Sequence, residues 1–215
     1  MKEKILSSAR KLFLEKGYQK TTLKDIVKDA GTSVGNCYFY YKNKEKILEA
    51  IIDSRAEAID KYSYDFLEKQ KINNLVKRIA TIIFIHSTYV LQQEETVKLY
   101  LMGSSFPDIR KLASARIESH IKDLEEFEDS ECKSDEVFGI KYKEYDDIFP
   151  ILYKSVFIGL VESFHLDEIN RTMEEMRVFM IRWVLSSIGV ETSEVNDTIN
   201  FVQSIDIDLE QLFKK

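Results

Sequence analysis

The hydrophobic residues of this chain recur at helical spacing from one end to the other. Near the start, apolar positions lie three or four residues apart while Lys, Glu and Arg occupy the other face: Ile5, Leu6, Ala9, Leu12 and Phe13. This spacing predicts an amphipathic helix with one side in a core. Gly17 then predicts the end of the helix, because glycine adopts the left-handed backbone conformation of a C-cap without strain.

Two short helices are predicted directly after this first one. Thr22, with Asp25 three residues later, comes close to a capping box and predicts a helix start, and Gly31 predicts its end. Thr32 and Ser33 open a third helix after a turn of a few residues. Two short helices joined by such a glycine-containing turn form the arrangement that places the second helix in the major groove of DNA.

The rest of the chain is dominated by longer helical patterns. Helices are predicted over residues 47–70, 72–93, 94–102, 107 onward, 148–166, 173–188 and 192–213. Residues 130–147 are acidic and weakly periodic, and they predict a loop or a distorted helix. The predicted fold class is all-α: an N-terminal helix-turn-helix head of three helices followed by a C-terminal helical bundle, with about nine or ten helices in total. We place the boundary so that the head covers residues 1–46 and the bundle covers residues 47–215.

The composition supports long helices in a soluble protein. Only 7 Gly and 2 Pro interrupt 215 residues, which disfavours turn-dense β architectures, and 44% hydrophobic with 32% charged residues is ordinary for a globular protein. No apolar run approaches the roughly 20 residues of a membrane span, and the charged first residues do not form a secretory signal. Two cysteines, Cys37 and Cys132, are too few for a disulfide framework or a cysteine-rich zinc site. We therefore expect a cytoplasmic protein without membrane contact.

The charge is distributed unevenly along the chain. Residues 1–50 contain eleven Lys and Arg against six Asp and Glu, whereas the whole chain has a net charge of −6. Because the remainder is therefore strongly acidic, only the predicted head is suited to contact a polyanion such as DNA.

The predicted third helix carries residue types that suit contact with nucleic acid. It contains four consecutive aromatic residues, Tyr38–Tyr41, and the tyrosine hydroxyls can donate to phosphate oxygens. Gly35 lets another surface approach the backbone, and Asn36 can pair with a base edge. Lys44 lies at the start of the next helix, where the helix dipole disfavours a cation, so a bound phosphate would relieve this conflict.

The segment Thr21–Leu48 resembles the DNA-binding domain of the tetracycline-repressor (TetR) family, and the resemblance covers roughly residues 3–50. It implies that the third helix reads the major groove of DNA and that the start of the fourth helix touches the backbone. The residues that would then face DNA are Thr22, Lys24, Ser33, Val34, Gly35, Asn36, Tyr38, Phe39, Tyr40 and Lys44. Three positions depart from the family pattern, namely Thr32, Cys37 and Tyr40, and they leave the base preference open. We interpret Cys37 as a small buried hydrophobe rather than a redox-active thiol.

The two most apolar long segments, 148–166 and 173–188, predict helices that are buried on more than one side. The resemblance implies that these helices pair with their copies in a four-helix dimer interface, which would match a palindromic operator. The interface residues expected on this basis are Phe157, Gly159, Leu160, Phe164, Phe179, Met180 and Trp183. The alternative is that both helices only fill the core of a monomer.

The resemblance further implies a transcriptional regulator, most simply a repressor, that a small hydrophobic effector releases from its operator. Aromatic residues at helical spacing belong more often to an ordinary core than to a ligand pocket, so the alternative for the expected ligand-binding residues is that they only pack in the core. These expected residues are Phe84, His86, Tyr89, Tyr100 and Phe106. The three histidines, His86, His120 and His165, show no metal-ligand spacing, so we predict no metal site and no cofactor.

The chain is not predicted to be an enzyme. It contains no glycine-rich phosphate-binding loop and no His-Glu-x-x-His motif. The expected partners are therefore double-stranded DNA, a second copy of the chain and a small effector. The alternative function is that of a helical ligand-binding or scaffold protein that no longer binds DNA specifically.

Overall fold

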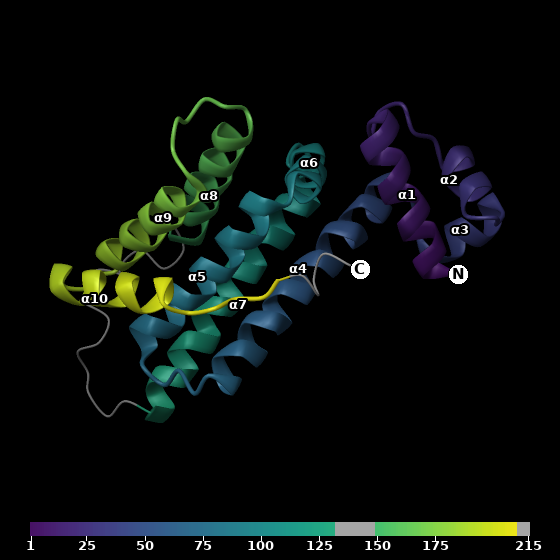
Figure 1. Ribbon diagram of the computed structural model, residues 1–215. Coiled ribbons are helices and arrows are strands. Elements are labelled where there is room, and N and C mark those ends of the chain that lie inside the picture. Colours follow the sequence, from purple (N-terminus) through teal and green to yellow (C-terminus); the bar gives the residue numbers. More distant parts are fainter. Residues whose placement is uncertain (132–148, 210–215) are drawn as a thin grey trace. The chain divides into compact units, whose positions relative to one another are not determined.

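The structure is a computed structural model, and it describes residues 1–131 and 149–209 (Figure 1). Within these residues the chain forms ten helices and no strand, which confirms the predicted all-α class. The helices are α1 Lys2–Lys16, α2 Leu23–Asp29, α3 Val34–Tyr40, α4 Lys44–Lys69, α5 Leu75–Gln92, α6 Glu94–Gly103, α7 Pro107–Glu131, α8 Phe149–His165, α9 Met173–Ser187 and α10 Thr192–Gln203. The predicted loop over residues 130–147 lies, beyond Glu131, outside the described residues.

The chain divides into two compact units, which we describe separately. The head unit comprises Met1–Glu57 and Gln93–Leu112, and the body unit comprises Ala58–Gln92 and Ala113–Lys215. The predicted boundary after residue 46 falls in the first turn of α4, and it stays a prediction.

Local signals set the ends of the first helices as predicted. Gly17 has a positive φ of 84°, and its N–H donates to the carbonyl oxygen of Phe13 at 3.0 Å. Tyr18 then packs on Phe13, with ring centroids 5.1 Å apart. At the start of α2, the Asp25 N–H donates to the Thr22 hydroxyl at 3.2 Å, and the Thr22 N–H donates to the Asp25 carboxylate at 2.9 Å. These two bonds form the capping box. The Thr22 hydroxyl also donates to the Asp25 carboxylate at 2.7 Å, and this bond, followed by the one from the Thr22 N–H, holds the pKa of Asp25 below its ordinary value.

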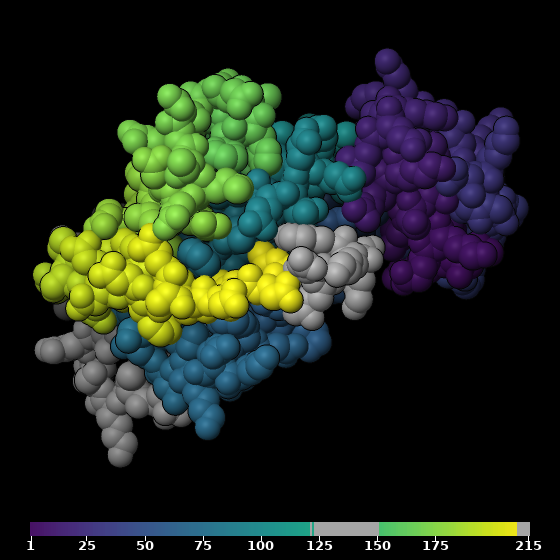
Figure 2. All heavy atoms as spheres, in the orientation of Figure 1, coloured from purple at the N-terminus to yellow at the C-terminus, as the bar shows by residue number. Residues whose placement is uncertain are grey.

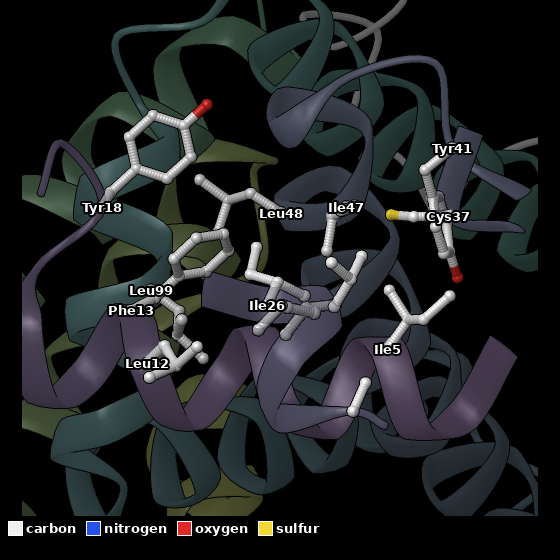
Figure 3. Packing of buried hydrophobic residues seen from close by; sticks show 14 of the residues in the cluster. Ile5, Leu12, Phe13, Tyr18, Ile26, Cys37, Tyr41, Ile47, Leu48 and Leu99 are labelled. Atoms are coloured by element: carbon white, nitrogen blue, oxygen red, sulfur yellow. The ribbon is translucent and has the colours of Figure 1, made fainter. Parts of the chain in front are cut away.

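The head unit has a hydrophobic core of its own (Figure 3). Buried side chains from α1 to the start of α4 meet there, and Leu99 of α6 and Ile109 of α7 join them. An ion pair between Arg10 and Glu95, with nitrogen and oxygen 2.6 Å apart, adds a contact between α1 and α6. The contribution of α6 and α7 to the core of the head unit was not predicted. An apolar face shows that a helix packs against another element, but it does not show which element that is.

In the body unit, α5 is the central helix. It contacts α8, α9 and α10, and most of its residues from Leu75 to Leu91 are buried. A second core cluster joins the later part of α4 and α5 to the chain that follows α10, and its buried members are Ile59, Phe66, Leu67, Ile72, Ile82, Ile85, Tyr89 and Leu209. No helix in the described part of the chain is both long and apolar enough to cross a membrane.

The C-terminal helix is shorter than predicted. α10 ends at Gln203, so the prediction of a helix over residues 192–213 is wrong for residues 205–209, which have no regular secondary structure. Ile205 and Ile207 alternate with aspartates, and both pack against the second core cluster, while Leu209 is buried. Apolar residues two apart, such as Ile205 and Ile207, favour an extended backbone. The prediction failed because Ile205 and Leu209, which are four apart, also fit a helical period.

Candidate functional site

The exposed aromatic residues of α3 are the most conspicuous surface feature of the head unit. Phe39 is 80% exposed, Tyr38 is 54% exposed and Tyr40 is 38% exposed. The Phe39 and Tyr40 rings meet edge to face, with centroids 5.1 Å apart. On the opposite side of the helix, Cys37 is buried in the head core, as predicted, and Tyr41 is buried beside it, whereas the other three rings point outward. Large exposed apolar groups held in a fixed place mark a binding surface.

The burial of Cys37 also bears on its chemistry. Its side chain is fully buried, and burial raises the pKa of its thiol. A thiol with a raised pKa forms little thiolate at neutral pH and reacts slowly. This environment supports the interpretation of Cys37 as a packing residue.

A hydrogen bond at the start of α3 orients Asn36. Its side-chain N–H donates to the Thr32 hydroxyl at 2.7 Å, and Gly35 beside it is exposed, with open space where a side chain would lie. Position 32 is one of the three departures from the family pattern. The Thr32 hydroxyl can accept this hydrogen bond, whereas an aliphatic side chain could not. One amide hydrogen of Asn36 is thus occupied, and its contact with a base stays a prediction.

The prediction that the chain is not an enzyme assumed that it lacks the Gly-x-Ser-x-Gly pattern of serine hydrolases, and this assumption is wrong because residues Gly31–Gly35 match the pattern. In those enzymes the serine lies on a sharp turn between a strand and a helix, next to an activating histidine. Here Ser33 follows a helix and caps α3, its hydroxyl oxygen accepting the Asn36 N–H at 3.1 Å. All three histidines of the chain belong to the body unit, so the unit that contains this serine supplies no histidine to activate it.

Lys44 has partners other than the phosphate that we expected. Its ammonium group donates to the carbonyl oxygens of Tyr18 at 2.6 Å and Thr21 at 2.9 Å, and it lies 4.1 Å from the centroid of the Tyr18 ring. Burial lowers the pKa of Lys44. The conflict between this cation and the helix N-terminus is thus relieved by carbonyl oxygens and an aromatic face. The neighbouring Lys42, which we did not single out, is exposed between α3 and α4.

The other predicted DNA contacts belong to the starts of α2 and α3. Thr22 and Lys24 are exposed at the start of α2, and Ser33 is exposed at the start of α3. Val34 is half-buried and packs against the head core, so it is the least accessible apolar residue of the predicted set.

Further exposed apolar residues lie on and next to α8 and α9 of the body unit. These two helices are the green and yellow-green part of Figure 2. The most exposed of these residues are Ile151, Leu152, Leu166, Met173 and Phe179, which are 38–60% exposed. Four more of the predicted interface residues, Phe157, Leu160, Phe164 and Trp183, are half-buried. Gly159 is exposed, and a Cβ atom added to it would meet nothing within 4 Å. Met180 differs, because only 2% of it is exposed and it packs inside the body unit.

The predicted effector residues do not gather in one unit. Phe84, His86 and Tyr89 lie on α5 in the body unit, whereas Tyr100 and Phe106 belong to the head unit. Tyr89 is a member of the second core cluster, and Phe106 packs edge to face on Tyr18 at 5.3 Å. Burial raises the pKa of Tyr100 to about 12. At least two of these aromatic residues therefore serve the core, and the effector site stays a prediction.

His86 and His120, which are far apart in the sequence and show no metal-ligand spacing, lie close together in the structure. Asp60 of α4 lies with its Oδ1 3.1 Å from Nε2 of His120 on α7 and 3.6 Å from Nε2 of His86 on α5. Arg116 pairs with the other carboxylate oxygen, and the Tyr64 hydroxyl lies 2.8 Å from Nδ1 of His120. The sequence signal was weak, since it consists of two pairs at i,i+4 spacing, Asp60 with Tyr64 and Arg116 with His120.

The environment of this cluster sets its charges. Burial, followed by the neighbouring His120, lowers the pKa of His86 to about 4, so His86 is neutral at physiological pH. Burial alone would raise the pKa of Asp60, but the hydrogen bond from His120 and the neighbouring charges hold it below its ordinary value. Among the described residues, the buried Nε2 of His86 has no hydrogen-bond partner.

Comparisons with known proteins agree with the geometry of the head. The sequence model of the family described as bacterial regulatory proteins, tetR family, matches residues 5–51. The biofilm operon negative transcriptional regulator IcaR of Staphylococcus epidermidis is 31% identical over 169 residues, which cover 76% of this chain and 80% of IcaR. The transcriptional regulator QacR of Staphylococcus aureus is 42% identical over 53 residues, which cover 25% of this chain and 28% of QacR.

A solved structure shares the fold over most of the chain. A TetR-family transcriptional regulator from Syntrophomonas wolfei aligns with a TM-score of 0.67 at 21% identity, covering 89% of this chain and 96% of that one.

Proposed function

The chain belongs to the TetR family and is a DNA-binding transcriptional regulator, and from this premise we propose that it is a homodimeric repressor of a palindromic operator. The relative IcaR is named as a negative regulator, which supports repression. The observation that carries the proposal is that exposed aromatic residues gather on α3 and further exposed apolar residues gather on α8 and α9. The first surface suits DNA, and the second suits another copy of the chain.

On the DNA side, α3 enters the major groove with Phe39 foremost. An exposed phenylalanine ring can contact the methyl group of thymine, and the hydroxyls of Tyr38 and Tyr40 can donate to phosphates at the groove edges. Ser33, Gly35 and Asn36 at the start of α3 complete the contacts in the groove. Thr22, Lys24 and Lys42 contact the backbone, and Lys44 supports the fold of the head with its two carbonyl partners.

On the dimer side, two copies pair through α8 and α9. The pairing covers Phe179 and the other exposed apolar residues, and Gly159 provides a position where a second helix can approach the backbone closely. A closed two-fold dimer presents two identical heads, and two identical heads match two half-sites of inverted sequence.

The effector is a small, largely apolar molecule that binds in the body unit near Phe84 of α5. Arg177 lies with its guanidinium 5.0 Å from the centroid of the Phe84 ring, so a cation and an aromatic face are available together. Binding of the effector releases the operator, and the protein acts in the cytoplasm, where the chromosome lies.

Fluorescence anisotropy on DNA fragments that flank the gene of this protein tests the proposal. We expect saturable binding to one fragment and a steep loss of affinity with salt. Phe39→Ala is expected to weaken binding to that fragment by about 10- to 100-fold with little effect on unrelated DNA, because it removes an apolar contact with a base. Tyr38→Phe is the matched variant. It keeps the ring and removes a phosphate donor, so it should weaken binding to all sequences alike.

Both side chains are exposed, so the circular dichroism spectra of these variants should match that of the wild type. Equal affinity of the wild type for every fragment, unchanged by Phe39→Ala, would contradict an operator read by α3. That result would favour the alternative of a helical scaffold that does not bind DNA specifically.

A further inference from the structure

We propose that Asp60, His86 and His120 form a binding site for a divalent transition-metal ion of the zinc class in the body unit. The three side chains come from α4, α5 and α7, and one ligand atom of each lies within 4.8 Å of the others. Two imidazole nitrogens and one carboxylate oxygen are a ligand set that zinc sites with an open position use. The proposal concerns metal binding alone and does not depend on how the head recognises DNA.

The distances between the ligand atoms fit a metal ion. In a tetrahedral zinc site with bonds of about 2.0–2.1 Å, neighbouring ligand atoms lie about 3.3–3.4 Å apart. The two distances from Asp60 Oδ1, 3.1 Å to His120 and 3.6 Å to His86, lie on either side of this value. Both distances fit an ion bonded to Asp60 and to each histidine, and the ligand atoms of the two histidines lie within 4.8 Å of each other.

His86 supplies an independent observation. A hydrogen bond to Asp60 accounts for the position of His120, but the 3.6 Å between Asp60 and His86 is too long for one. Nε2 of His86 is buried and, among the described residues, has no hydrogen-bond partner. Buried polar atoms in folded proteins are nearly always satisfied, so an unsatisfied one indicates a missing ion, water or ligand.

The surrounding side chains orient the ligands as in known metal sites. Metal-bound histidines usually donate their second ring N–H to an oxygen atom, which fixes the tautomer. Here Nδ1 of His120 lies 2.8 Å from the hydroxyl of Tyr64, so an N–H donated to that oxygen leaves Nε2 free for the ion. Arg116 holds Oδ2 of Asp60, which leaves Oδ1 for the ion.

The ligand types also restrict the class of ion. Calcium and magnesium require mostly oxygen ligands, whereas imidazole suits zinc, cobalt and nickel. The charge of Arg116 opposes any cation, so only an ion that bonds strongly to nitrogen compensates for it. An acidic ligand fits less well, because Asp60 already occupies Arg116 and would repel a second anion.

Isothermal titration of the chelator-treated, full-length protein with Zn²⁺ tests the proposal. We expect one ion per chain with micromolar or tighter affinity, and a visible absorption band of four-coordinate intensity when Co²⁺ is used instead. His86→Ala and His120→Ala should each weaken binding by about 100-fold or more, since each removes one of three protein ligands. His165→Ala is the matched control, because this third histidine lies near the Val90 carbonyl oxygen at 3.3 Å and outside the cluster.

Thermal unfolding separates metal binding from folding. Zn²⁺ should raise the Tm of the wild type and of His165→Ala, and it should leave the Tm of His86→Ala unchanged. If a histidine variant does not fold, the Co²⁺ absorption spectrum of the wild type tests the site instead. An octahedral spectrum like that of the aqueous ion would contradict the proposed site. Zn²⁺ binding equal in the wild type and in folded His86→Ala would also overturn the proposal, and it would make the cluster a purely structural set of hydrogen bonds.

Discussion

Replacing Gly159 with arginine is expected to leave the fold of a single chain intact and to abolish dimerisation. A side chain at this position meets open space in the single chain, and arginine favours a helix more than glycine does. In a dimer formed by α8 and α9, the same side chain would bury an unpaired charge among apolar residues. Such burial costs about 3–5 kcal/mol, which raises the dissociation constant of the dimer by about 150- to 5,000-fold.

Sedimentation velocity at several protein concentrations measures this effect. Asp197→Arg on α10 is the control, because it places the same residue at an exposed position of the body unit outside α8 and α9. The wild type and the control should sediment as dimers, and Gly159→Arg should sediment as a monomer with an unchanged circular dichroism spectrum. A Gly159→Arg protein that remains dimeric would show that the copies pair through another surface.

Lys44→Met is expected to destabilise the head unit. Its ammonium group donates to two backbone carbonyl oxygens, Tyr18 and Thr21, and a methionine side chain of similar length leaves both without this donor. Because a hydrogen bond from a charged group contributes about 1.5–3 kcal/mol, we expect the free energy of unfolding to fall by at least about 2 kcal/mol. Urea denaturation followed by circular dichroism measures the change.

Lys42→Met separates the structural role from contact with DNA. Lys42 is exposed two residues earlier, so its loss should leave the urea midpoint unchanged. It should instead weaken DNA binding for all sequences and lower the slope of log affinity against log salt by about 0.9, the effect of one lost phosphate contact. The opposite pattern, with a stable Lys44→Met protein that has the reduced salt slope, would restore Lys44 as the phosphate ligand.

Features set by neighbouring residues could be predicted from the sequence. The capping box of Thr22 and Asp25, the end of α1 at Gly17 and the start of α6 after residue 93 depend on local hydrogen bonds and backbone preferences. The outward position of the α3 aromatic residues followed from the same local pattern. The end of α10 was misjudged, because Ile205 and Leu209 are four residues apart and fit a helical spacing, although residues 205–209 have no regular secondary structure.

Features that depend on distant residues could not be predicted. The charge of Lys44 at a helix start was evident, but its carbonyl partners come from a loop more than twenty residues earlier. Likewise, Asp60, His86 and His120 lie on three helices, and only their packing brings the ligand atoms together. Sequence spacing detects metal ligands on one helix or one loop, so a site assembled from three helices leaves almost no signal.

The core of the head unit is made by two stretches of chain that are synthesised at different times. Phe13 and Ile47 leave the ribosome early, whereas Leu99 and Ile109, which complete the same core, follow only after residues 58–92 of the body unit. At about 5–20 residues per second, the first stretch waits for several seconds before the second arrives. A chain that is cut short before residue 93 therefore lacks Leu99 and Ile109, and the core of its head unit stays incomplete.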